Sequence, residues 1–312
     1  MNVVWPFLLF VVGVVLAVWA TERLLEGMVG LAVRLGVSTF AMGAVLSGFE
    51  AENVAVGLAA ARNGASEVAL GTVFGGATFL VCVALGLGAV LYPLRVNLPR
   101  GFLVLMAACP VVVGVGLLGG RTSPLAGAFL LAAFVAALVY LVRASREHAF
   151  VESEEVREGL EKRRPFGATL GLTVFGLVAI AVGGELVSRG AVGIVSSLGL
   201  SALLVGMVVT PAAIELEEVV RQAVPAKEGR PEVAAGNLIG TLLYFLWFNL
   251  GLIALIVPVE VDPLIVRLDW PYLVAVTWLA VVFLARGRVG RVEGAVLLAA
   301  YAGYTALHLV AG

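Results

Sequence analysis

The sequence has few charged residues, and this shortage excludes most classes of soluble protein. Asp, Glu, Lys and Arg make up only 13% of the 312 residues, whereas a soluble globular domain carries about 25%. Hydrophobic residues account for 61% of the chain, and the mean hydropathy is +1.08. One water-soluble domain could not bury so much apolar surface. The composition therefore predicts a polytopic membrane protein.

Basic residues, cysteines and catalytic motifs are also scarce. The formal net charge is −1 and no basic stripe could follow a phosphate backbone, so no nucleic-acid partner is expected. The two cysteines, Cys82 and Cys109, lie in apolar stretches and are expected to pack as small hydrophobic residues. The chain lacks a His-Glu zinc motif, a Gly-x-Ser-x-Gly elbow and a phosphate-binding loop, which argues against an intramembrane enzyme.

Apolar stretches of about 20 residues, the length that crosses a bilayer, recur along the whole chain. The first, residues 3–20, has no preceding positive region, so we expect a membrane helix that is retained rather than a cleaved signal peptide. Residues 28–62 are joined into one long, interrupted helix. The ten predicted spans are 3–21, 28–62, 66–93, 101–119, 124–143, 166–188, 193–224, 233–257, 268–285 and 290–309.

The basic residues between these spans predict the orientation. Assigned to alternate sides, four Lys and Arg residues fall on one side and sixteen on the other, which is a strong positive-inside bias. Both termini are therefore expected outside, and the hydrophilic segment 144–165 in the cytoplasm. We interpret this segment as a solvated linker, with a regulatory segment as the alternative, between two five-helix halves, 1–143 and 166–312. The histidines, His148 and His308, have no partner visible in the sequence and receive no role.

An internal repeat relates the two halves. Residues 20–45 align without gaps with residues 183–208 at an offset of 163, and residues 67–76 align with residues 232–241 at an offset of 165. Because each half has an odd number of helices, the repeats are predicted to have inverted topology, with a shared site near the midplane. The identities include Glu22/Glu185, Gly30/Gly193, Leu35/Leu198, Gly36/Gly199, Ser38/Ser201 and Gly43/Gly206.

Two acidic stretches interrupt the apolar background, VVTPAAIELEEVV at residues 208–220 and LSGFEAENVAV at residues 46–56. A charged group at bilayer depth is costly unless it is neutralised, paired or bound to an ion. Clustered carboxylates therefore predict a cation site built from both repeats. Their glutamates are Glu215, Glu217 and Glu218 in the first stretch and Glu50 and Glu52 in the second.

Helical spacing sorts these glutamates by direction. On a regular helix Glu215 and Glu218 share a face, whereas Glu217 points elsewhere, and Glu50 and Glu52 also diverge. Other acidic residues have structural interpretations. The pair Glu22 and Glu185 is expected to anchor helix ends or to form ion pairs with nearby Arg23 or Arg189, and Glu67 and Glu232 suit helix N-termini.

Pro211 and several glycines lie near the acidic stretches. Pro211 removes a helix hydrogen bond four residues before Glu215 and is expected to break the helix beside the carboxylates. The glycines either allow close helix packing or let the backbone unwind so that carbonyls coordinate a cation, and both alternatives stay open. They are Gly71, Gly75, Gly76, Gly236 and Gly240.

These stretches resemble the alpha-repeats of the cation/calcium antiporter superfamily, whose members carry motifs like G-T-S-L-P-E and, further along, G-N-x-x-G-S. From Ser201 to Gly236 the spacing agrees with that pattern and places Glu218 at the motif glutamate, with Asn237 and Thr241 in the downstream motif. The first repeat is similar: Ala51-Glu52 takes the place of P-E, and Gly71, Thr72 and Gly75 that of G-N-x-x-G. The Thr-Ser pair of sodium-coupled relatives is absent, which leaves fewer neutral oxygens and more carboxylates.

The resemblance implies an all-α membrane fold of ten helices in two inverted five-helix repeats. It also implies a secondary antiporter that exchanges Ca²⁺ for H⁺ or Na⁺ by alternating access, with helices near 3–21 and 166–188 sliding past an ion-binding core. Carboxylates, carbonyls and water can hold Ca²⁺, and when it leaves, mutual repulsion and desolvation favour protonation of the same carboxylates. A Na⁺/H⁺ exchanger, an exchanger of another divalent cation and a transport-inactive homologue are alternatives.

The predicted cation ligands come from both repeats. Glu52 and Glu218 are the central ligands, Glu215 is a third ligand or a proton carrier, and Glu50 and Glu217 are further candidates. The neutral candidates are Asn237, Thr241, Thr210 and Thr72. No resident cofactor is expected. The expected partners are membrane lipid and inorganic cations, the expected location is the plasma membrane, and the sequence specifies no oligomeric state.

Overall fold

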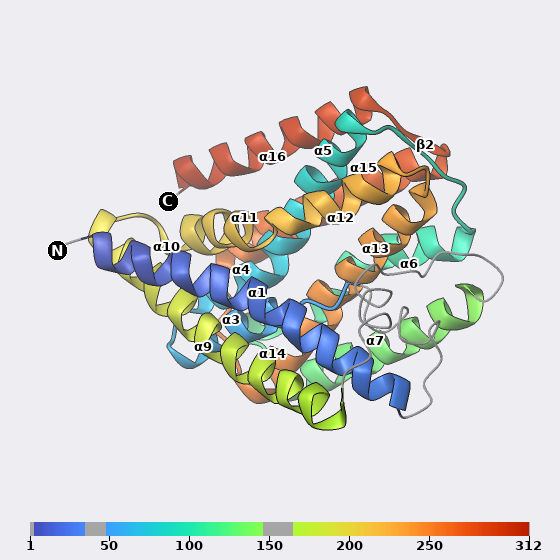
Figure 1. Cartoon of the computed structure of the whole chain (residues 1–312). Coiled ribbons are helices and arrows are strands. Elements are labelled where there is room, and N and C mark those ends of the chain that lie inside the picture. The colour runs from blue at the N-terminus through green and yellow to red at the C-terminus, as the bar shows by residue number, and fades with distance from the viewer. Residues whose placement is uncertain (1–2, 35–47, 146–164, 312) are drawn as a thin grey trace.

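A computed structural model describes residues 3–34, 48–145 and 165–311, and nearly all of them are helical (Figure 1). Within these residues, eight helices are long and apolar enough to cross a membrane, and Ala202–Ile214 is a shorter apolar helix. The eight are Val4–Ala32, Ser66–Leu91, Arg100–Leu117, Pro124–Ala144, Phe166–Leu198, Pro231–Ile256, Ile265–Ala285 and Arg291–Val310. The prediction of an all-α, polytopic membrane protein is confirmed.

Helices α1 (Val4–Arg34) and α9 (Phe166–Leu198) pack antiparallel along most of their length, as Figure 1 shows. Small residues permit this close approach. A Cβ atom on Gly183 would lie 2.8 Å from the backbone nitrogen of Ala17, and one on Gly190 would overlap Phe10. The absence of side chains at these glycines therefore lets the backbones of α1 and α9 approach each other closely.

The continuity of α1 corrects the predicted boundary between residues 21 and 28. The prediction ended a helix at 21, but α1 runs on past this residue, and Arg23 and Glu26 form an ion pair of 3.3 Å within it. Helix α1 continues to Arg34. The predicted helix 28–62 is therefore wrong at its start. The repeat positions Leu35, Gly36, Ser38 and Gly43, like most of the predicted linker 144–165, lie outside the described residues.

The predicted helices 166–188 and 193–224 are also wrong in their boundaries. Helix α9 continues to Leu198, where Gly199 ends it in the left-handed conformation with φ +63°. A broken segment follows, formed by α10 (Ala202–Leu204), the π-helical turn η3 (Val205–Val209) and α11 (Thr210–Ile214). The expected break beside the carboxylates is present at Glu215. Pro211 itself lies in the first turn of α11, where a missing N–H is tolerated.

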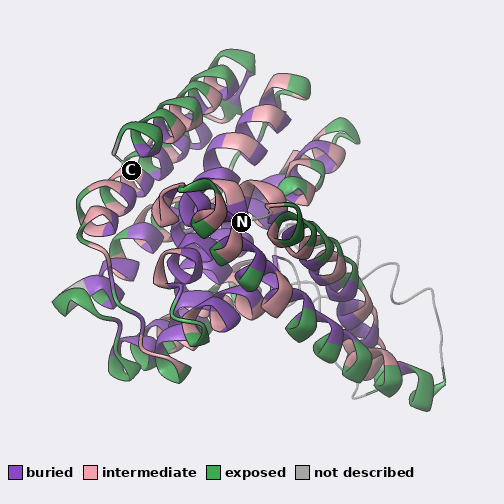
Figure 2. Cartoon of the chain, turned by 90° about the vertical axis from the view of Figure 1, so that its left-hand side faces the viewer, coloured by how far each residue is buried: buried purple, intermediate pink, exposed green. Residues whose placement is uncertain are grey.

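The centre of the molecule holds two similar runs of helices. In the first half α3 (Ala51–Arg62) leads to α4 (Ser66–Phe79), the π-helical turn η1 (Leu80–Ala84) and α5 (Leu85–Leu91). In the second half α12 (Leu216–Lys227) leads to α13 (Pro231–Leu243), η4 (Tyr244–Asn249) and α14 (Leu250–Ile256). In the most apolar 18-residue stretches of the spans Ser66–Leu91 and Pro231–Ile256, 83% and 72% of the residues are buried, more than in the other candidate spans. They form the core that Figure 2 shows as the buried centre of the molecule.

The remaining helices lie around this core. They are α6 (Arg100–Val112) with the 3₁₀ turn η2 (Val113–Gly120), α7 (Pro124–Ser145), the π-helical turn η5 (Ile265–Asp269), α15 (Trp270–Ala285) and α16 (Arg291–Ala311). Short β1 (Leu94–Arg95), after α5, pairs antiparallel with β2 (Arg288–Val289), before α16. Reciprocally, Arg121, before α7, bridges to Glu260, after α14. Each half thus contributes one loop to each pairing.

Crowding at the α1–α9 contact leads to a stability prediction. We expect Gly183→Val to destabilise the protein by about 1–3 kcal/mol, because the new side chain must push against the backbone of α1. Gly171→Val is the matched control in the same helix, since a Cβ atom there meets nothing within 4 Å. Thermal unfolding in detergent measures both. Equal melting temperatures for the two variants would contradict the packing described for α1 and α9.

Candidate cation site

Both acidic stretches lie at a helix start. Glu50 is the residue before α3 and Glu215 is the residue before α12, and these two positions are 165 apart, the offset of the internal repeat. The first turns that follow carry Glu52 in α3 and Glu217 and Glu218 in α12. A helix N-terminus stabilises negative side chains in its first turn. Each half therefore places its carboxylates at the N-terminus of an equivalent helix.

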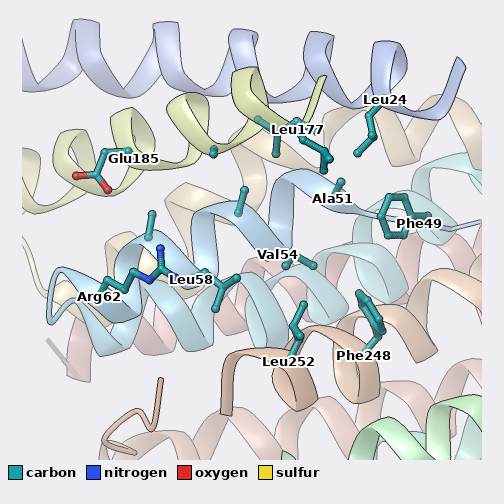
Figure 3. A pocket seen from close by; sticks show the side chains of 14 residues that line it. Leu24, Phe49, Ala51, Val54, Leu58, Arg62, Leu177, Glu185, Phe248 and Leu252 are labelled. Atoms are coloured by element: carbon teal, nitrogen blue, oxygen red, sulfur yellow. The ribbon is translucent and has the colours of Figure 1, made fainter. Parts of the chain in front are cut away.

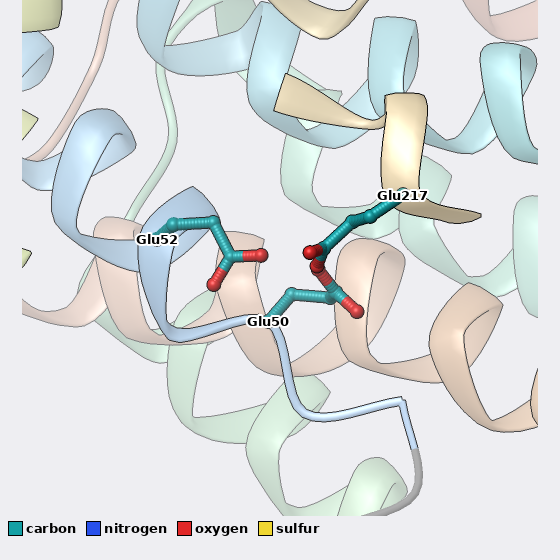
Figure 4. Close-up of side chains that lie close together, drawn as sticks. All are labelled: Glu50, Glu52 and Glu217. Carbon is teal, nitrogen blue, oxygen red and sulfur yellow. The ribbon is translucent and has the colours of Figure 1, made fainter. Parts of the chain in front are cut away.

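The glutamates of the two halves meet inside the protein. Glu50, Glu52, Glu215 and Glu218 are fully buried, and the side chain of Glu217 is 24% exposed. One oxygen from each of Glu50, Glu52 and Glu217 lies within 4.8 Å of the other two, as Figure 4 shows. Glu215 is close enough to Glu52 and Glu218 to interact with them electrostatically. We call these five residues the glutamate cluster.

The directions expected from regular helical spacing are wrong for three of the glutamates. Glu217 was expected to point away, yet it faces Glu50 and Glu52. Glu50 and Glu52 were expected to diverge, yet their oxygens approach each other. The reason is local: the backbone is not helical at Glu50 or at Glu215, so i, i+2 and i, i+3 rules do not apply across these residues.

An arginine belongs to the cluster. On α12, Nη1 of Arg221 contacts Oε1 of Glu50 and lies 2.8 Å from Oε1 of Glu218, while Nη2 lies 2.8 Å from Oε1 of Glu217. The arginine side chain is only 17% exposed. Sequence analysis counted all twenty Lys and Arg residues as charges between the spans, and for Arg221 this is wrong. The available signal was its i+3 and i+4 spacing from Glu218 and Glu217.

Neutral polar groups complete the cluster. Nδ2 of Asn237, on α13, donates to Oε2 of Glu218 at 3.1 Å, and the hydroxyl of Thr21, on α1, donates to Oε2 of Glu52 at 2.6 Å. Asn53 and Gln222 are fully buried. Sequence analysis missed Thr21, Asn53 and Gln222. For Asn53 a signal existed, because the offset of 165 places it opposite Glu218.

The three predicted threonines are buried, with different surroundings. Thr72 donates to the carbonyl of Ala69 in its own helix at 2.9 Å. The hydroxyl of Thr241 faces the turn at Gly48, 2.7 Å from the position of a Cβ atom there. The hydroxyls of Thr210 and Thr241 have no hydrogen-bond partner among the described residues. Their role as ligands stays a prediction.

The glycines of α4 pack closely rather than unwinding. The backbone is helical through Gly71 and Gly75, and a Cβ atom on either would overlap the backbone of η3. Gly76 serves the cluster differently, because Oε1 of Glu215 lies 3.3 Å from the position of its missing Cβ atom. A side chain at residue 76 would compete with that carboxylate for space.

Several buried oxygens in the cluster have no hydrogen-bond partner among the described residues. More than nine-tenths of buried polar groups in folded proteins are normally satisfied. Carboxylate and amide oxygens are also the ligands that hard cations such as Ca²⁺ prefer. The arrangement can therefore bind a cation with atoms from both halves. The atoms are Oε2 of Glu50, Oε1 of Glu52, both carboxylate oxygens of Glu215 and Oδ1 of Asn53.

A cavity of about 320 Å³ lies beside the cluster, between α3, α9 and α14 (Figure 3). Its lining is mainly apolar and includes Ala51, the residue between Glu50 and Glu52. Arg62 and Glu185 line the opposite end, as Figure 3 shows. Glu185 accepts from Arg189 at 2.6 Å, which confirms the ion pair expected for this glutamate. The cavity runs along α3 from this polar end toward the glutamates.

Comparison with known proteins finds relatives over nearly the whole chain. Residues 5–143 and 168–310 match the family described as sodium/calcium exchanger protein. CaxA of Alkalimonas amylolytica, a protein named as a candidate antiporter, is 28% identical over 308 residues, covering 94% of this chain and 95% of CaxA.

Two solved structures share the fold. The crystal structure of the H⁺/Ca²⁺ exchanger CAX superposes with a TM-score of 0.76 at 16% identity, covering 98% of this chain and 86% of CAX. The sodium-calcium exchanger NCX_Mj superposes with a TM-score of 0.61 at 22% identity, covering 98% of this chain and 99% of NCX_Mj. At these identities the likeness concerns the fold.

Proposed function

Because this chain belongs to the sodium/calcium exchanger family and is a membrane transporter rather than an enzyme, we propose that it exchanges Ca²⁺ for H⁺ by alternating access in the cell membrane. One observation carries the proposal: two helix starts, one from each half, bring five glutamates into a single buried cluster with unpartnered oxygens. Na⁺ as the counter-ion is the alternative that the experiment below distinguishes.

The proposed architecture has ten membrane helices in two inverted repeats, residues 1–143 and 166–312, joined by a linker at 144–165, with both termini outside. Its support is the matched order of elements in the two halves, including π-helical turns η1 and η4 at equivalent places. The reciprocal loop pairings between the halves also fit a pseudo-two-fold relation. Inverted repeats create a shared site near the membrane midplane.

In the proposed site, Glu52 and Glu218 are the central ligands of Ca²⁺. Glu215 is the third ligand or the proton carrier, Glu50 and Glu217 complete the acidic shell, and the neutral candidates are Asn237, Thr241, Thr210 and Thr72. Five carboxylates and one guanidinium carry a net charge of −4 (−5 + 1) when all are ionised. A charge of this size at bilayer depth needs compensation by cations or protons.

The chemistry of the cluster favours Ca²⁺ and H⁺ over Na⁺. Ca²⁺ binds about six to eight oxygens and tolerates irregular, carboxylate-rich geometry. Carboxylates that lose such an ion repel one another in an apolar environment and take up protons. The same groups thus serve both ions in turn. An exchange of one Ca²⁺ for protons follows without a separate sodium site.

A hydrogen bond connects the cluster to the helix pair α1 and α9. Thr21, on α1, donates to Glu52, on α3, so a displacement of α1 would change the environment of a proposed central ligand. Glycine contacts between α1 and α9 would let the pair move as one unit. We propose that sliding of α1 and α9 past α3 opens the cluster to alternate sides, with the cavity along α3 as one access path.

Flux through proteoliposomes tests the function directly. We expect ⁴⁵Ca²⁺ uptake into vesicles loaded at acidic pH, collapse of that uptake by a protonophore with the membrane potential clamped, and little uptake driven by an outward Na⁺ gradient. Glu228→Gln, which alters an exposed ion pair with Arg230 outside the cluster and the cavity lining, should leave uptake unchanged. Uptake that depends on Na⁺ instead would overturn proton coupling. Uptake equal to that of protein-free vesicles under both gradients would overturn Ca²⁺ exchange.

A further inference from the structure

The guanidinium of Arg221 contacts three glutamates of the cluster at once. Nη1 contacts Oε1 of both Glu50 and Glu218, and Nη2 lies 2.8 Å from Oε1 of Glu217. The carboxylates of Glu50 and Glu217 face each other from the two halves, as Figure 4 shows, and would repel without a cation between them. A planar guanidinium suits this place because its N–H groups form a fixed fork. Arg221 therefore lies where the two halves meet, at the place proposed for Ca²⁺.

Both carboxylate oxygens of Glu218 already have a donor. Oε1 lies 2.8 Å from Nη1 of Arg221, and Oε2 accepts from Nδ2 of Asn237 at 3.1 Å. A positive charge beside Oε1 repels a second cation that approaches this oxygen. Glu52, the other proposed central ligand, has one oxygen without a hydrogen-bond partner among the described residues. A cation that binds both central ligands must therefore displace the guanidinium from Glu218.

Ca²⁺ and Na⁺ differ in what they gain from this displacement. The guanidinium carries one positive charge, so replacing it with Na⁺ leaves the charge beside the carboxylates unchanged, whereas Ca²⁺ doubles it. Arg221 is also attached to the helix that carries Glu217 and Glu218, which gives its charge a high effective concentration at the cluster. A dissolved ion of the same charge competes poorly with such a tethered group. An arginine in this place therefore favours divalent over monovalent cations.

The internal repeat gives no structural reason for an arginine at this position. The offset of 165 that relates α3 to α12 places Val56 opposite Arg221. Val56 is fully buried, so the equivalent helix of the first half forms and packs without a charge there. Replacing a buried ion pair by apolar residues is often neutral or stabilising. Stability alone therefore does not account for Arg221.

The side chain of Arg221 lies at the edge of the cluster rather than at its centre. It is 17% exposed, whereas the side chains of Glu50 and Glu218 are fully buried. The long, flexible stem of an arginine lets its charged head turn toward water while the stem stays packed. Rotation of this one side chain can therefore uncover Oε1 of Glu218 without a shift of α12.

We propose that Arg221 is a tethered monovalent cation that makes the glutamate cluster selective for divalent cations. It binds Glu50, Glu217 and Glu218 in the absence of Ca²⁺, leaves at least Glu218 when Ca²⁺ binds, and excludes Na⁺ from these carboxylates. The proposal rests on the proposed function, because it concerns the selectivity of the same site. It also gives a physical reason for proposing H⁺ rather than Na⁺ as the counter-ion.

Sodium-23 nuclear magnetic resonance tests the exclusion of Na⁺ without transport. We expect Arg221→Gln in detergent to broaden the ²³Na⁺ signal, and added Ca²⁺ to reverse the broadening, whereas the wild type causes little broadening. Arg221→Lys keeps a single positive charge and should behave like the wild type. Arg230→Gln is the matched control, because Arg230 is 32% exposed and pairs with Glu228 outside the cluster. Equal signals for the wild type and Arg221→Gln, or for the Lys and Gln variants, would overturn the proposal.

Competition for ⁴⁵Ca²⁺ binding measures the size of the effect, and Ca²⁺ is present throughout for a variant that needs it to stay folded. Replacing about 100 mM N-methyl-D-glucamine by Na⁺ should lower the apparent Ca²⁺ affinity of Arg221→Gln at least about tenfold and that of the wild type less than about twofold. The same loss in both proteins would overturn Arg221 as the selectivity residue. The flux experiment is independent: absent H⁺-driven uptake rejects the proposed exchange, whereas the Na⁺ measurements decide on Arg221 alone.

Discussion

Replacing Glu218 by glutamine should lower H⁺-driven ⁴⁵Ca²⁺ uptake about 100-fold. Glu218 is fully buried, accepts from Asn237 and pairs with Arg221, so its carboxylate is held in place by the protein. Loss of one partner of a buried charge pair costs about 2–5 kcal/mol, and each 1.4 kcal/mol is about tenfold in affinity. Glutamine has almost the same shape, so the effect reports the charge. Initial rates of uptake into proteoliposomes measure it.

The matched variants separate ligand loss from general damage. Glu52→Gln should show a similar loss, because Glu52 is the central ligand proposed from the first half. Glu228→Gln should keep the wild-type rate, since the Glu228 side chain is 46% exposed and pairs with Arg230 outside both the cluster and the cavity lining. Unchanged uptake in Glu218→Gln would reject this cluster as the transport site. Loss in Glu218→Gln with full activity in Glu52→Gln would reject a site shared by the two halves.

Replacing Arg221 by glutamine should make the stability of the protein strongly dependent on Ca²⁺. Arg221 is the guanidinium that pairs with Glu50, Glu217 and Glu218. Breaking a buried ion pair by removing one partner costs about 3–5 kcal/mol, because an uncompensated charge remains. A bound Ca²⁺ can compensate the same carboxylates. We therefore expect a lower melting temperature without Ca²⁺, recovery on its addition, and Ca²⁺ binding at least about tenfold tighter than in the wild type.

The exposed pair formed by Arg189 and Glu185 provides the control for this variant. Its side chains are 67% and 35% exposed, and surface pairs contribute at most about 1 kcal/mol. Arg189→Gln should therefore change neither the melting temperature nor its Ca²⁺ dependence appreciably. Calorimetric titration and thermal unfolding in detergent measure both properties. Weaker Ca²⁺ binding in Arg221→Gln would show that Arg221 does not compete with the cation for the glutamates.

Composition and the repeat pattern predict the class of this protein and much of its candidate site. The low charge content identified a membrane protein, and five glutamates in apolar surroundings pointed to the buried cluster. Both predictions depend on a strong physical penalty, the cost of placing charge in an apolar environment. A large penalty leaves a clear signal in a single sequence.

Details that depend on tertiary contacts were not predictable in this way. Arg221 reads as a loop charge because its partner Glu50 is 171 residues away in the chain. Helix α1 continues past residue 21 through a charged segment in which Arg23 pairs with Glu26, and hydropathy alone does not register this pairing. The direction of Glu217 depends on a single residue, Glu215, at which the backbone is not helical. In each case one specific contact or one backbone conformation outweighs the average pattern.

Anomalous diffraction from crystals soaked in Sr²⁺, a heavier analogue of Ca²⁺, tests most directly whether both halves bind one shared cation. The account predicts a single strong anomalous peak in the glutamate cluster, at coordination distance from carboxylate oxygens of both Glu52 and Glu218, with the guanidinium of Arg221 displaced from at least one glutamate. A peak held by glutamates of one half alone, or no peak with Arg221 still paired to Glu50 and Glu218, would contradict it.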